Sequence, residues 1–241
     1  MNTIQHILNW SEVWSPLIPL TIYIFLKPGA RWIKPILLFL MITFIFGLAI
    51  DLIWYRKKLG INPWFEKNFW WWLDTDPKTG KKNVLKNNIF YNLNSFGRLF
   101  FFSIFFQYFY PIFKKLNRFV PWTFLILMII NFVWFENIKD FSSRQHSVEA
   151  AILLFYSLLY FYKTTLDDSI EAPAALPQSW LVSGLTLYTA INFFIFLFYK
   201  YLMSLPQFNI YAVEIWNVHN ISFILLNIFI AISFYKSKKH E

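Results

Sequence analysis

Long apolar runs separated by short polar connections dominate the chain. A membrane-spanning helix needs about 20 mostly apolar residues. Seven segments approach this length, near 10–27, 34–55, 89–113, 119–136, 147–163, 179–203 and 213–235. The first is the weakest, because Pro16 and Pro19 interrupt it. The pattern predicts an all-α, polytopic integral membrane protein, with residues 1–241 forming one bundle of seven transmembrane helices. In a six-helix alternative, the first segment is re-entrant.

The signals at the segment ends agree with this prediction. Pro35, Pro121 and Pro177 stand at or just before a segment, where the missing N–H costs little. Tryptophans near the predicted ends would form an aromatic belt at the membrane interface. They are Trp10, Trp14, Trp32, Trp54, Trp122, Trp134 and Trp180. No strand-like alternation competes with these helices, which argues against a membrane β-barrel.

The connection from 56 to 88 is longer than the others and contains "NPWFEKNFWWWLD". Pro63 suits a helix start, and a dense Trp and Phe cluster follows it. Because exposed Trp70, Trp71 and Trp72 would be costly in water, we expect a short amphipathic helix in the headgroup layer between the second and third spans. The segment "DPKTGKK" after it predicts a turn.

Composition strengthens the membrane assignment, since 57% of the 241 residues are hydrophobic, 23% are aromatic and only 15% are charged. A soluble domain could not cover that much apolar surface. The net charge of +9 lies in connections and in the C-terminal "KSKKHE", which points to anionic lipid headgroups rather than nucleic acid. The predicted location is the inner (cytoplasmic) membrane, with several passes.

Basic residues give a weak orientation signal. With the N-terminus outside and the C-terminus inside, ten basic residues face inward and three outward once the long 56–88 connection is left out. That connection holds eight more on the outer side, and Arg56 directly follows the second span, against the positive-inside rule. The expected orientation is N-out, C-in.

Two ionisable residues fall within predicted spans, Asp51 near the end of the second and Arg98 in the third. A charge inside a span costs about 2.5–3.5 kcal/mol on insertion scales and is normally paired. Similar depths predict an Asp51–Arg98 salt bridge assisted by Asn94. The alternative is that Arg98 extends to the headgroups.

The seventh segment carries a polar stripe at helical spacing. Glu214, Asn217, Asn220 and Asn227 follow at steps of three, three and seven, and His219 lies on a neighbouring face. Amides in hydrocarbon need partners, so the stripe faces protein or a cavity. Both readings stay open: contacts that join helices, or contacts with a ligand.

Motifs for catalysis are missing from the sequence. The chain has four His and no Cys, and it contains no HExxH, no Gly-rich phosphate loop and no GxSxG. We therefore predict no catalytic residues, no metal site and no cofactor, and a non-enzymatic role is favoured.

The order of several segments is familiar: "NIFYNLNSFGRLFFFSIFF", "SVEAAILLFYSLLYFYK", "LPQSWLVSGLTLYTAINFFIFLF" and "EIWNVHNISFILLNIFIAISFYKSKK". With Trp180, Gly184 and Tyr188 in the sixth segment and His219-Asn220 in the seventh, the chain resembles a group of uncharacterised bacterial seven-helix membrane proteins. Their genes often stand beside those of histidine kinases or LytTR-type regulators. This chain departs from the group at Gly97-Arg98, where relatives commonly carry Glu, and in its longer preceding connection.

These observations favour a membrane sensor or accessory protein that binds a lipid or small molecule in its bundle and acts through a protein partner. A transporter or channel would instead need a polar pathway across the bundle. A lipid-modifying enzyme would need convergent ionisable groups. A structural subunit of a larger membrane complex is the remaining alternative.

Overall fold

The computed structural model describes residues 3–56, 58–68, 73–75, 82–85, 88–138, 140–167, 172, 175–204 and 209–239. Within these ranges the regular secondary structure is helical apart from one short hairpin. The elements are α1 (Thr3–Asn9), α2 (Ser11–Trp14), α3 (Leu17–Leu26), α4 (Ile33–Tyr55), α5 (Asn62–Asn68), β1 (Leu73–Thr75), β2 (Lys82–Leu85), α6 (Asn88–Phe106), α7 (Pro111–Leu116), α8 (Val120–Ile130), α9 (Ser143–Thr165), α10 (Pro177–Ser204) and α11 (Asn209–Lys239). A π-helical turn, Asn131–Phe135, extends α8.

Four helical stretches of the described chain are long and apolar enough to cross a membrane. They are Ile33–Ile53, Pro111–Phe135, Pro177–Tyr199 and Glu214–Lys239. The apolar stretch Ser11–Leu26 is shorter than these. The prediction of a helical membrane protein is confirmed to this extent, as a helical chain with four stretches of membrane-spanning length. The long helices α6 and α9 run through the same bundle and carry many buried polar side chains.

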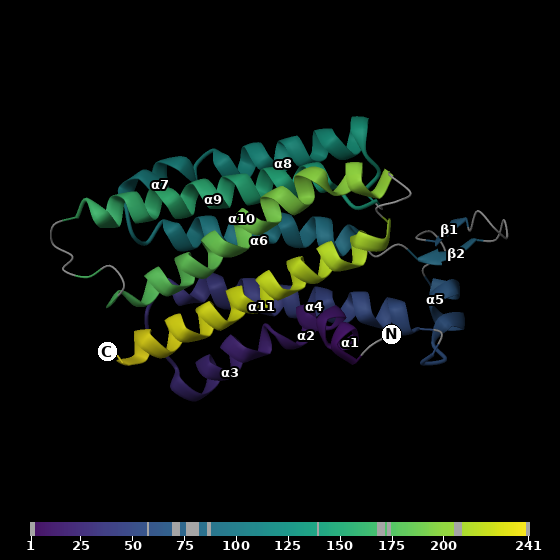
Figure 1. The fold of residues 1–241 in the computed structure, drawn as a ribbon, viewed down its shortest axis with the longest axis horizontal. Helices are drawn as coiled ribbons and strands as arrows, with labels where there is room; N and C mark the ends of the chain where they lie inside the picture. Colours follow the sequence, from purple (N-terminus) through teal and green to yellow (C-terminus); the bar gives the residue numbers. More distant parts are fainter. Residues whose placement is uncertain are drawn as a thin grey trace.

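The long helices lie side by side along one axis (Figure 1). The N-terminus, α5 and the hairpin lie at one end, and the C-terminus and α7 lie at the other. We call these the N-terminal end and the C-terminal end of the bundle. Helix α10 packs between α9 and α11, while α4 packs on α6 and α3 packs on α11.

Local chemistry explains several helix boundaries. The first predicted segment is broken between α2 and α3, where Pro16 precedes Leu17. Helix α3 ends at Leu26, and the next residue, Lys27, has a positive φ of 47° that forms a left-handed cap before Pro28. The third predicted segment also divides, because α6 stops at Phe106 and Pro111 starts α7 after an extended residue.

The 56–88 connection agrees with its prediction only in part. Helix α5 forms where the helix start was expected, while Trp70, Trp71 and Trp72 lie outside the described residues. The hairpin was not predicted: β1 and β2 pair antiparallel, with Leu73 opposite Leu85. Strands of three and four residues are too short for alternation to be visible in the sequence. Most of the predicted turn also lies outside the described residues.

Aromatic side chains fill the C-terminal half of the bundle. Phe102, Phe105, Phe106 and Phe113 are fully buried, and so are two tyrosines of α9, Tyr156 and Tyr160. The ring of Phe106 lies 5.0 Å from that of Phe113 and 5.6 Å from that of Tyr156 between centroids. Packed rings at these separations fill most of this part of the described bundle, and the few polar groups among them, such as Asn117, are hydrogen-bonded to their neighbours.

Candidate functional site

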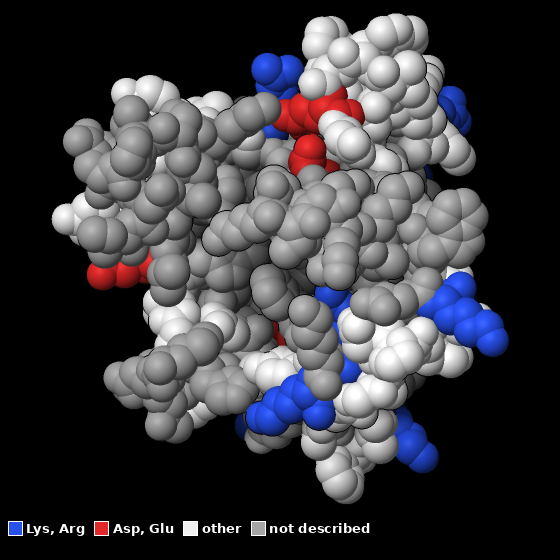
Figure 2. Space-filling view, turned by 90° about the vertical axis from the view of Figure 1, so that its right-hand side faces the viewer, with Lys and Arg blue, Asp and Glu red and all other residues white. Residues whose placement is uncertain are grey.

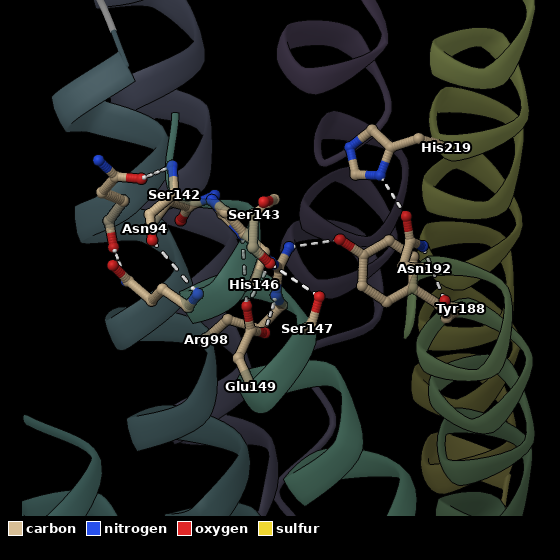
Figure 3. Close-up of polar contacts among 12 residues, drawn as sticks. Asn94, Arg98, Ser142, Ser143, His146, Ser147, Glu149, Tyr188, Asn192 and His219 are labelled. Carbon is tan, nitrogen blue, oxygen red and sulfur yellow. Dashed lines mark hydrogen bonds and ion pairs between the residues drawn. The ribbon is translucent and has the colours of Figure 1, made fainter. Parts of the chain in front are cut away.

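A buried ion pair lies in the middle of the bundle. Arg98 of α6 donates through Nε and Nη2 to both carboxylate oxygens of Glu149 in α9, the second contact at 2.8 Å. Its Nη1 donates to the hydroxyl of Tyr188 in α10 at 2.5 Å. Arg98 and Glu149 are only 5% and 1% exposed. Three helices therefore meet at one charged centre (Figure 3).

The predicted Asp51–Arg98 salt bridge is wrong. Arg98 pairs with Glu149, and because it is buried it does not extend to the headgroups either. Asn94, the expected helper, accepts a hydrogen bond from Thr43 of α4 at 3.0 Å instead.

Glu149 was not among the predicted site residues; the fifth segment was expected near 147–163, which puts this acid close to its start. The helix begins four residues earlier, at Ser143, after Ser142 caps the backbone N–H of Gln145. This start places Glu149 two turns into the helix, at the depth of Arg98. The sequence did carry a signal for this residue, because Glu149 is an acid at the start of an apolar segment.

A chain of polar contacts leads from this ion pair toward the N-terminal end of the bundle. Asn192 donates to the carbonyl of Tyr188 at 2.7 Å, and its Oδ1 lies 2.5 Å from Nδ1 of His219. An amide oxygen only accepts, so Nδ1 of His219 carries the proton. The other ring nitrogen, Nε2, faces Oε1 of Glu12 at 3.8 Å. The four side chains come from α10, α11 and α2.

His146 lies beside the ion pair. Its Nδ1 is 3.7 Å from Oε2 of Glu149, and its ring stacks on Phe141 at 4.7 Å with 10° between the planes. Neither ring nitrogen has a hydrogen-bond partner within the described part of the chain. His146 thus connects the ion pair to Phe141, a residue of the cavity described next.

A cavity of about 570 Å³ opens where the polar chain ends. Two of its described lining residues are carboxylates, six are aromatic and none is Lys or Arg. The lining comprises Asn9, Trp10, Glu12, Gly47, Ile50, Asp51, Tyr55, Asn88, Tyr91, Phe141, Tyr199 and Trp216. Asp51, predicted as a partner of Arg98, is therefore a cavity residue.

Close backbone contact explains how Glu12 reaches this cavity. A Cβ at Gly47 of α4 would lie 3.0 Å from the carbonyl oxygen of Glu12, so the two backbones meet where one residue has no side chain. The break after α2 lets this short helix turn across α4. The acid is then held beside His219.

Figure 2 views the molecule from the N-terminal end. Carboxylates are visible between other side chains near the top of this face, and several Lys and Arg side chains lie at its edges. A second hollow of about 410 Å³ adjoins the cavity and shares Phe141 and Tyr199 with it.

The residues of the polar stripe on α11 make different contacts. Asn217 exchanges two amide hydrogen bonds with Gln5 of α1, at 2.8 and 2.9 Å, and Asn227 donates to Ser15 at 3.0 Å. These two amides join helices. Asn220 is buried and its Nδ2 has no partner within the described ranges, while Glu214 is exposed. Only His219 belongs to the polar chain that reaches the cavity.

The amide pair gives a direct test of how α1 is held. Asn217→Ala removes both hydrogen bonds to Gln5, so we expect a loss of about 0.5–2 kcal/mol and faster hydrogen exchange over residues 3–9. Hydrogen–deuterium exchange with mass spectrometry measures this. The control is Glu214→Gln, an exposed change on the same helix that leaves exchange in α1 as it was. Unchanged exchange in Asn217→Ala would show that other contacts hold α1.

The described residues contain no group of three His, Cys, Asp or Glu side chains able to hold a metal ion. The charged centre is sealed, and the groups that a small molecule could reach are the carboxylates and aromatic rings of the cavity. The chain matches no protein-family model, no curated protein and no solved structure.

Proposed function

We propose that this protein is a non-enzymatic membrane sensor or accessory protein, which binds a small ligand in the cavity and passes a conformational change to a protein partner. The observation that carries the proposal is the polar chain from Glu12 through His219 and Asn192 to the centre formed by Arg98 and Glu149. A ligand at Glu12 would act on one end of this chain. The other end joins three helices, so a shift there moves the bundle.

The proposed topology is seven passes in the inner membrane, N-out and C-in, with α2 and α3 together making the first pass and α5 lying in the headgroup layer. Basic residues of α7 and the end of α11, such as Lys114, Lys115 and Lys238, would then face the cytoplasm. They would meet anionic headgroups or an acidic partner. The resemblance noted above suggests a histidine kinase or a LytTR-type regulator as that partner.

A transporter is the second candidate, and the packing argues against it. A transport pathway must be polar on both sides of its binding site. Here the buried rings of Phe102, Phe106 and Tyr160 fill the bundle beyond the ion pair. A structural subunit would need neither the cavity nor the polar chain.

The absence of cysteine allows a clean test of coupling. Asn9 is exposed and lines the cavity, so a cysteine is placed there by Asn9→Cys. Benzyl methanethiosulfonate then attaches a benzyl group to this cysteine, and the group occupies the cavity. We expect altered hydrogen exchange at the C-terminal end, over residues 110–118 and 236–239. Asn192→Leu removes the side-chain link between Tyr188 and His219, so the response should fall at least severalfold in that background.

The control is Trp134→Cys, 70% exposed on the extension of α8, which carries the same reagent outside the cavity and should change nothing at the far end. A tether at residue 9 that leaves the far end unaltered would contradict the sensor. Ion or solute flux in proteoliposomes containing the unmodified protein would favour the transporter.

A further inference from the structure

We propose that the cavity binds an organic cation, an amine or quaternary ammonium group attached to a compact apolar body. This inference rests on the proposed function, because it names the ligand class of the same cavity. Three properties carry it: the charge of the lining, its aromatic faces, and its size.

The charge of the lining is negative. Glu12 and Asp51 both border the cavity, and no Lys or Arg does so within the described lining. This is unusual for a chain with a net charge of +9. His219 adjoins one of these acids, with its Nε2 3.8 Å from Oε1 of Glu12. Carboxylates in a recess shielded from bulk water attract a cation more strongly than at an open surface.

The aromatic lining provides the second property. Tyr91, Phe141 and Tyr199 surround Trp216, with ring centroids 5.9, 5.7 and 6.0 Å from the indole. These rings come from α6, the segment before α9, α10 and α11. Trp10 adds a further ring at the same cavity. Aromatic faces stabilise ammonium groups by about 0.5–2 kcal/mol each and form the known cages for quaternary ammonium ligands.

The combination of size and chemistry separates this ligand from others. About 570 Å³ lies within the range of small-molecule pockets, roughly 300–1,000 Å³. A calcium or magnesium ion would need about six or more oxygen ligands, and half of the described lining is aromatic. An anion would meet two carboxylates. A neutral acyl chain would bring no positive charge to the two carboxylates of the lining.

The test compares choline with its neutral isostere 3,3-dimethylbutan-1-ol. Calorimetric titration uses the full chain in nanodiscs of phosphatidylglycerol, a lipid without an amine. We expect choline to bind at least about tenfold more tightly than the alcohol, since about 1.4 kcal/mol is a factor of ten. A second preparation that contains phosphatidylcholine distinguishes the source of the ligand. Weaker choline binding in that preparation means that the lipid headgroup competes for the site, whereas unchanged choline binding points to a free amine.

Two variants locate the site. Glu12→Gln should weaken choline binding about tenfold and leave binding of the alcohol unchanged. The control is Glu214→Gln, the loss of an exposed carboxylate of α11 that lies outside the described lining, and it should bind as the parent does. If Glu12→Gln does not fold, Trp216→Leu replaces it, because losing the central indole should also weaken choline binding severalfold.

Equal binding of choline and the alcohol, or binding insensitive to Glu12→Gln and Trp216→Leu, overturns the cationic ligand. So does the absence of choline binding at millimolar concentration. None of these results removes the proposed sensor, which depends on the long-range response to the tether at residue 9. Loss of that response together with tight choline binding would instead leave a cation site without signalling.

Discussion

Arg98→Ala and Glu149→Ala are each expected to lower the free energy of unfolding by about 3–5 kcal/mol. Each change leaves one charge buried without its partner, since Arg98 is 5% exposed and Glu149 1% exposed. The double variant Arg98→Met/Glu149→Leu removes both charges and fills the space with apolar atoms, so most of the stability should return. The hydroxyl of Tyr188 then loses its donor, at about 1 kcal/mol. Equilibrium unfolding in mixed micelles measures all three.

The matched control is Arg144→Ala. Its side chain is 63% exposed and its Nε lies 4.0 Å from Oε1 of Glu136, so the loss should stay below about 1 kcal/mol. Asp51→Asn supplies a second comparison, because the structure does not pair this acid with Arg98. If Asp51→Asn were as damaging as Glu149→Ala, or if both alanine variants unfolded like the parent, the assigned ion pair would be wrong.

Gly184→Ala should cost about 1–3 kcal/mol, although it adds only one methyl group. A Cβ at this position of α10 would lie 2.5 Å from the Cβ of Phe229 in α11, an atom fixed to the backbone and unable to rotate away. The two helices would have to separate along their contact. The thermal midpoint in detergent should therefore fall by several degrees.

Gly97→Ala is the matched change in α6. No atom within 4 Å would meet its Cβ, and alanine favours a helix over glycine by about 1 kcal/mol. This variant should therefore keep or raise the thermal midpoint. A Gly184→Ala protein as stable as Gly97→Ala would mean that α10 and α11 are not in close contact at this point.

The ion-pair variants and Gly184→Ala both test contacts that must be rigid if the proposed sensor is to transmit a change. Arg98 and Glu149 tie α6 to α9, and Gly184 lets α10 approach α11. The cavity is lined by residues of α2, α4, α6, α10 and α11. A ligand in the cavity would contact helices that are tightly packed against one another outside it. Because a close-packed core transmits displacements, a small shift at Glu12 can reach the other end of the bundle.

The sequence by itself determined the helical class, because segments such as 34–55 are long and apolar enough to cross a membrane, where a helix satisfies its own backbone groups. Proline fixed local breaks too, as at Pro16. The sequence also located the polar residues worth attention, including Arg98 and His219. Only the tertiary structure decided which side chains they meet.

The reason is physical. Helix periodicity sets which residues share a face, but the rotation of each helix about its axis is set by packing against its neighbours. The start of α9 at Ser143 brought Glu149, rather than Asp51, to the level of Arg98. The cavity draws on α2, α4, α6, α10 and α11 together, so no local pattern in the chain could reveal it.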